Sequence, residues 1–151
     1  GAGFATFGLD VSHTLKYEQD AYYKSGVLVG ASYDAAGFLN ASRTARPLPD
    51  LKGRVFGEYS LDQHNFFVYA NYITSYEDER YAGTKVDSQT TYDLHYQYSF
   101  MDDHARVTVS AMNVTDEDPP LARLDLSYDG YTHNAFGRMI KVGVEYTIGE
   151  G

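Results

Sequence analysis

The sequence predicts an all-β fold, an antiparallel transmembrane β-barrel segment of about six strands. First, apolar and polar residues alternate along several stretches, most of which are 10 residues or longer. Average strands in globular proteins have about 5–6 residues, whereas a tilted membrane crossing needs about 9–11. Second, the predicted connections alternate between short and long, which is typical of outer-membrane barrels.

The first stretch shows the alternation most clearly. From residue 5 to residue 17 the odd positions are apolar except for His13, and the even positions are polar or glycine. A helix would distribute these residues around its axis, so the period of two predicts a strand. The same pattern predicts further strands over residues 52–60, 65–76, 88–100, 104–113 and 136–148.

The polar faces of these strands are rich in Gly, Ser, Thr, Asn and Gln. A water-filled or plugged lumen fits this composition better than the outer face of a soluble sandwich, which is richer in Lys and Glu. Tight turns are expected around residues 62–64 and 101–103, on the periplasmic side. Long outer loops are expected over residues 19–50, 77–87 and 114–135.

Composition excludes several classes of function. The net charge of −9 argues against nucleic acid as a partner, because phosphate neutralisation needs a basic face. The chain has no Cys, which removes thiolate metal sites and Cys nucleophiles. No catalytic constellation and no metal-ligand spacing can be argued, so we expect no enzyme, no metal and no cofactor. The chain also shows neither a signal-peptide pattern nor an apolar run long enough for a transmembrane helix.

Several segments resemble TonB-dependent outer-membrane receptors, and they occur in the order of that family. They are residues 34–40 (DAAGFLN), 45–49 (ARPLP), 71–78 (NYITSYED), 85–91 (KVDSQTT), 113–120 (NVTDEDPP) and 128–138 (YDGYTHNAFGR). The resemblance covers nearly the whole chain. It implies that residues 1–151 are the C-terminal portion of a barrel of roughly 22 strands, and that the plug domain and its TonB box are absent from this chain.

The last predicted strand resembles the signal read by the barrel-assembly machinery. That signal is a polar residue, a glycine two positions later, and hydrophobic or aromatic residues three and five positions after the glycine. Lys141, Gly143, Tyr146 and Ile148 fit this pattern. The family usually ends in an aromatic residue; here Ile148 takes that place and residues 149–151 follow.

The resemblance also implies a function and a location. The chain would belong to an active-transport receptor in the bacterial cell outer membrane, which takes up a scarce nutrient such as a siderophore, haem, cobalamin or a glycan. Its implied partners are outer-membrane lipid, the remainder of the barrel, the plug domain, the TonB complex through that plug, and the barrel-assembly machinery.

Tyr and Arg residues in the predicted outer loops are candidate substrate contacts, because these two residue types anchor many recognition surfaces. They are Tyr22, Tyr23, Tyr33, Arg43, Arg46, Arg123 and Tyr128. The apolar stretch at residues 26–30 predicts that the first loop folds over the barrel mouth.

Two alternatives remain open from the sequence. If residues 25–34 and 36–45 are strands, the count rises to eight, which suffices for a complete small barrel with a structural or adhesive role. In that case the first strand pairs with the last. The other alternative is a soluble β-sandwich that binds carbohydrate through its Tyr residues.

Overall fold

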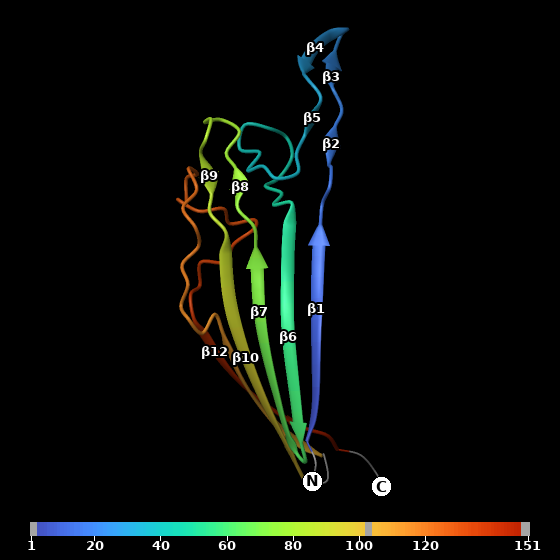
Figure 1. Cartoon of the computed structure of the whole chain (residues 1–151), viewed down its shortest axis with the longest axis vertical. Coiled ribbons are helices and arrows are strands. Elements are labelled where there is room, and N and C mark those ends of the chain that lie inside the picture. Colours follow the sequence, from blue (N-terminus) through green and yellow to red (C-terminus); the bar gives the residue numbers. More distant parts are fainter. Residues whose placement is uncertain (1–2, 102–103, 149–151) are drawn as a thin grey trace.

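The computed structural model describes residues 3–101 and 104–148. Six long strands form one antiparallel sheet in the order β1-β6-β7-β10-β11-β12 (Figure 1). They are β1 (Phe4–His13), β6 (Leu51–Leu61), β7 (His64–Ile73), β10 (Gln89–Phe100), β11 (Ala105–Met112) and β12 (Met139–Tyr146). The prediction of an all-β chain with six principal strands is therefore confirmed.

The first and the last of the predicted strands differ most from expectation, and both are shorter. β1 ends at His13, because the Thr14 N–H donates to Asp50 O at 2.7 Å and the chain leaves the sheet there. β12 begins only at Met139, since the Arg138 N–H is held by Asp116 Oδ1 at 2.7 Å. It ends at Tyr146, so Ile148 lies beyond the strand. Residues 102–103 of the predicted second turn, and residues 149–151, lie outside the described residues.

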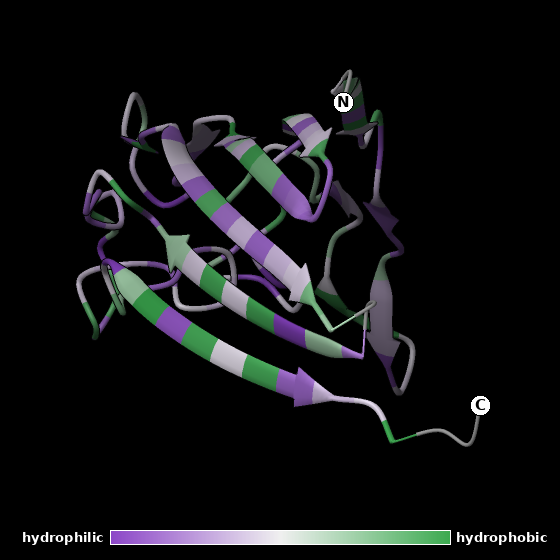
Figure 2. Ribbon diagram, turned by 90° about the horizontal axis from the view of Figure 1, so that it is seen from below, coloured by the Kyte–Doolittle hydropathy of each residue, from purple (hydrophilic) through white to green (hydrophobic). Residues whose placement is uncertain are grey.

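One face of the sheet is apolar across all six strands. The register brings apolar residues and glycine into continuous rows, and one row contains Phe7, Gly57, Val68, Leu94, Ala111 and Ile140. This face is largely exposed: Phe7 is 81% accessible, Leu94 44% and Ile140 70%. Figure 2 shows the resulting bands of hydrophobic and hydrophilic residues along the strands.

Aromatic side chains gather on the apolar face near the short turns. His64 Nδ1 lies 2.7 Å from the Tyr96 hydroxyl, and the Tyr98 and Phe100 rings stack with their centroids 5.8 Å apart. Tyr146 ends the apolar row of β12 at the same end of the sheet. The predicted turn at residues 62–64 is a two-residue turn, and His64 is the first residue of β7.

The other face carries a polar network. Arg54 Nε donates to Asn71 Oδ1 at 2.8 Å, and Asn71 Nδ2 donates to Asp93 Oδ2 at 2.9 Å. His95 Nδ1 lies 2.8 Å from Ser110 Oγ. Arg54, Asp93 and His95 line a shallow hollow of ≈ 400 Å³ with two aromatic rings. The polar groups of this hollow are therefore largely paired with one another.

The edges of the sheet test the two alternatives left open by the sequence, a closed eight-stranded barrel and a β-sandwich. Among the described residues β1 pairs only with β6 and β12 only with β11, so the first strand does not pair with the last. Residues 25–34 and 36–45 add no strand to the sheet, and the eight-stranded closure is not formed. The described residues also lack the second facing sheet that a β-sandwich requires. They contain no helix that is long and apolar enough to span a membrane.

Three two-stranded sheets lie beyond the upper ends of the long strands (Figure 1). They are formed by β2 (Glu18–Gln19) with β5 (Tyr33–Asp34), β3 (Tyr22–Lys24) with β4 (Val27–Gly30), and β8 (Tyr76–Glu77) with β9 (Lys85–Val86). The β3–β4 hairpin projects beyond the other loops in continuation of β1. The expectation that its apolar stretch folds over a barrel mouth is wrong, since Val27 is 66% and Val29 61% exposed.

Candidate functional site

Apart from the projecting β3–β4 hairpin, the three long connections meet in a single packed unit, which we call the loop layer: residues 14–21, 31–50, 74–88 and 113–138. The largest fully buried side chains among the described residues, Tyr76, Leu39, Val86 and Asp129, all belong to it. Leu39, Tyr76, Val86 and Ala122 form its hydrophobic core, with contributions from each of the three connections. The sheet therefore carries a layer with a core of its own.

Backbone hydrogen bonds join the first two connections. Phe38 forms bridges with both Leu48 and Glu77. The Leu39 N–H donates to Glu77 O at 2.8 Å, and the Glu77 N–H donates to Gly37 O at 2.9 Å. These bonds fix the position of the first connection relative to β8.

Asn40 holds the first connection in a compact turn. Its side-chain amide Nδ2 lies within 3.1 Å of the carbonyl oxygens of Ala35, Phe38 and Arg46. Its backbone φ is 55°, in the left-handed region that Asn tolerates better than most residues. An amide side chain that is only 3% exposed is thus satisfied within its own turn.

A buried hydrogen-bond network joins the second and third connections to β10. The Tyr76 hydroxyl donates to Asp129 Oδ2 at 2.8 Å and lies 3.1 Å from His133 Nε2. Gln89 donates its amide hydrogen to Asp118 O, so its Oε1 faces His133 Nδ1 at 2.8 Å and accepts from it. All four side chains are less than 10% exposed, so the bond from Tyr76 to Asp129 and the bond between His133 and Gln89 replace hydrogen bonds to water.

Burial shifts two pKa values in this network. Desolvation, with a contribution from the Asp129 charge, raises the pKa of Tyr76, so its phenol stays protonated and remains a donor. Desolvation lowers the pKa of His133; the charge of Lys52 acts in the same direction and that of Asp129 opposes it. The folded protein therefore favours the neutral imidazole.

The loop layer is expected to loosen as the pH falls below about 6.5, the ordinary pKa of His. The unfolded segment binds a proton there that buried His133 resists, so the stabilisation is complete above this pH and is lost as the pH falls through the lowered pKa of the folded state. Hydrogen-exchange protection of residues 129–134, corrected for intrinsic exchange, measures the effect. His133→Gln should flatten the profile, and His104→Gln, at the opposite end of the sheet, should not. An unchanged profile in His133→Gln would contradict this prediction.

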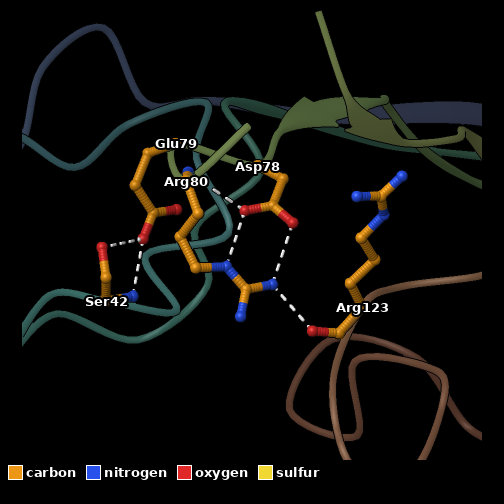
Figure 3. Close-up of polar contacts among 5 residues, drawn as sticks. All are labelled: Ser42, Asp78, Glu79, Arg80 and Arg123. Carbon is orange, nitrogen blue, oxygen red and sulfur yellow. Dashed lines mark hydrogen bonds and ion pairs between the residues drawn. The ribbon is translucent and has the colours of Figure 1, made fainter. Parts of the chain in front are cut away.

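Two charged clusters attach the second connection to the first and the third (Figure 3). Arg80 binds Asp78 through Nε at 2.8 Å and Nη2 at 2.9 Å, and Nη2 also donates to Arg123 O at 2.7 Å. Hydrogen bonding from Arg80 holds the pKa of Asp78 below its usual value. The Asp78 carboxylate thus stays charged, and Arg80 is fixed between two connections.

Glu79 makes the other cluster with Ser42 of the first connection. Glu79 Oε1 accepts from the Ser42 N–H at 2.7 Å and from the Ser42 hydroxyl at 2.9 Å. Desolvation acts to raise the pKa of Glu79, but the hydrogen bonds from Ser42 outweigh it, so this pKa lies below its usual value. Glu79 Oε2 is buried without a hydrogen-bond partner among the described residues.

Beside the Asp78–Arg80 pair lies an open hollow of ≈ 580 Å³. We call it the third-loop hollow. Arg80, Arg123, Asp125, Leu126, Tyr128 and Tyr131 are among its lining residues. Two of the predicted substrate contacts, Arg123 and Tyr128, therefore line the same hollow. Arg46 lies near it, with its guanidinium 5.1 Å from the centroid of the Tyr131 ring.

The other predicted contacts lie elsewhere. Arg43 packs its guanidinium 4.7 Å from the Tyr33 ring centroid, and the Tyr33 hydroxyl accepts from the Ala45 N–H, so this pair stabilises the first connection. Tyr22 and Tyr23 lie on the projecting β3–β4 hairpin, with 60% and 59% of their surface exposed. The structure thus divides the predicted set into three groups and brings only part of it to one hollow.

The residues that organise the loop layer were not predicted as site residues. Tyr76 and Asp129 are 53 positions apart and Gln89 and His133 are 44 apart, so no local spacing indicates their contact. Of these contacts, only the Asp78–Arg80 ion pair could have been predicted locally, because two opposite charges lie two positions apart in the sequence. Among the described residues no group of three or more His, Cys, Asp or Glu could hold a metal ion.

Comparisons with protein-family models, with curated proteins and with solved structures find no match to this chain. The function is therefore argued from the sheet and the loop layer alone.

Proposed function

We propose that this chain forms barrel wall and outer loops of an outer-membrane active-transport receptor, energised through TonB, for uptake of a scarce nutrient. The observation that carries the proposal is the apolar face of the sheet. It runs across six strands of 8–12 residues and is not covered by any other described element. In water such a face would be costly, whereas hydrocarbon solvates it and the strands satisfy their own backbone groups.

The arrangement of connections supports the same proposal. The two short connections lie at one end of the sheet, and the three long ones lie at the other. Tyr and His side chains on the apolar face near the short turns resemble the aromatic girdle of membrane barrels. We place the loop layer outside the cell and the short turns in the periplasm.

The two outer edges of the sheet support the proposal of a larger barrel. β1 and β12 each have one partner strand among the described residues, and an open edge in lipid leaves backbone groups unpaired. We propose that the remainder of a larger barrel pairs with both edges. Lys141, Gly143 and Tyr146 lie on the edge strand β12, where the barrel-assembly machinery would read them, and Ile148 follows it with 91% exposure.

Site-directed fluorescence quenching tests the membrane assignment. The chain has no Cys, so Val142→Cys or Gly143→Cys gives a single labelling site within it. These residues are adjacent on β12 but lie on opposite faces of the sheet. In vesicles with brominated acyl chains we expect strong quenching at position 142 and weak quenching at 143. Equal quenching at the two positions would overturn the assignment.

Growth of a strain that lacks the gene tests the transport assignment. We expect a defect when one of iron, haem, cobalamin or a glycan is limiting, and the same defect when TonB is depleted. Normal growth under all four limitations would overturn the transport role while leaving the membrane assignment in place.

A further inference from the structure

The third-loop hollow is open to the outside of the loop layer and is rigid at its base. Its volume of ≈ 580 Å³ lies within the range of small-molecule sites. Arg80, at its wall, is fixed by Asp78 and by the carbonyl of Arg123 (Figure 3). The backbone that presents Arg123 is thereby held in place before any ligand arrives.

The hollow offers both donors and acceptors that have no hydrogen-bond partner among the described residues. The Arg123 guanidinium lies 4.8 Å from the Tyr81 ring centroid and makes no hydrogen bond within the described part of the chain. In residues 3–101 and 104–148, the Asp125 carboxylate and the hydroxyls of Tyr128 and Tyr131 also have none. Arg80, in contrast, is already committed to Asp78 and Arg123.

The charges of these groups select against ionic ligands. An anion would be attracted by the Arg123 guanidinium but repelled by the Asp125 carboxylate. A cation would be attracted by Asp125 but repelled by Arg123. A hydroxyl group can accept from a guanidinium and donate to a carboxylate, so it satisfies both without a charge of its own. A neutral ligand rich in hydroxyl groups therefore matches the polar side chains.

The apolar part of the lining indicates the shape of the ligand. The Arg46 guanidinium lies over one face of the Tyr131 ring. Tyr131 is nevertheless 73% exposed and Leu126 66%, so the rest of the ring and an aliphatic surface are available in the hollow. Tyr presents an apolar ring with a polar tip, which suits a ligand with C–H faces and hydroxyl edges. We propose that the third-loop hollow binds a neutral saccharide, with Arg123 and Asp125 contacting its hydroxyls and Tyr131 its ring face.

The role of this site as the capture site rests on the proposed transport function, whereas the ligand chemistry rests only on the side chains of the hollow. Titration calorimetry of the intact protein in lipid nanodiscs tests the chemistry. Nanodiscs are needed because detergents with sugar headgroups would compete. The probes are neutral trisaccharides of glucose, mannose, galactose and xylose, with trigalacturonate as the anionic probe and chitosan trisaccharide as the cationic probe.

We expect at least one neutral trisaccharide to bind, and to bind more tightly than either charged probe. Arg123→Gln, Asp125→Asn and Tyr131→Ala should each weaken it about tenfold or more, because each removes a hydrogen bond to a charged group or a stacking face. Lys24→Gln and Leu28→Ala, on the projecting hairpin, are the matched controls and should leave binding unchanged.

Two results would overturn the inference: tighter binding of a charged probe than of every neutral one, and no binding of any neutral probe. Equal loss in the hairpin controls would also contradict it. These results are separable from the proposed function, because the quenching difference between positions 142 and 143 does not depend on the ligand.

Discussion

If the apolar face contacts lipid, as proposed, Val109→Arg is expected to destabilise the inserted protein by about 2–4 kcal/mol, the cost of a cation near the middle of a lipid-facing strand. Val109 lies mid-way along β11, on the apolar face between Tyr96 and Val142. Urea unfolding in vesicles, followed by the heat-dependent shift in gel migration, measures the loss. The inserted fraction should fall in parallel.

The adjacent residue provides the matched control. Thr108 precedes Val109 on the same strand but faces the polar side, between Gln97 and Gly143. Thr108→Arg introduces the same charge beside a glycine, where there is open space for a long side chain. It should change stability by less than about 1 kcal/mol. If the two variants lose stability equally, the apolar face does not contact lipid.

Leu39→Ala is expected to destabilise the loop layer by about 2–5 kcal/mol, because it leaves a cavity in a core with few members. Leu39 is fully buried against Tyr76, Val86 and Ala122. Hydrogen exchange should accelerate at residues 35–40, 76–78 and 122–124, while the centres of β7 and β10 keep their protection. The effect is local because the core of the loop layer is separate from the sheet.

Leu28→Ala is the control for this substitution. Leu28 lies on the projecting hairpin and is 52% exposed, so the same truncation removes little packing. Its expected effect is within about 0.5 kcal/mol. Equal exchange rates in the Leu39 and Leu28 variants would show that the buried cluster does not hold the three connections together.

The faces of the sheet could be predicted from the sequence because a strand has a period of two. Ala5, Phe7, Leu9 and Val11 were assigned to one face by alternation alone, and the register confirms it. The strand ends could not be predicted, because they depend on distant groups. β1 stops where Asp50 accepts from Thr14, and β12 starts where Asp116 has bound Arg138.

The contacts within the loop layer could not be predicted from the sequence, for a related reason. Its contacts join segments that are far apart in the chain, and no periodic pattern encodes them. The same principle explains the error for residues 26–30, which are apolar but pair with β3 in a short hairpin, through a two-residue turn, instead of covering the sheet. Ser25 and Gly26 adopt φ values of 52° and 79°, as such a turn requires.

The packed core of the loop layer separates the residues that maintain its shape from those that face outward. Leu39, Tyr76 and Asp129 are buried, whereas Leu121, Leu126 and Tyr131 are 75%, 66% and 73% exposed. Substitutions at such exposed positions usually change stability by no more than about 0.5 kcal/mol. The surface of the loop layer can therefore change in sequence while the framework below it keeps its shape.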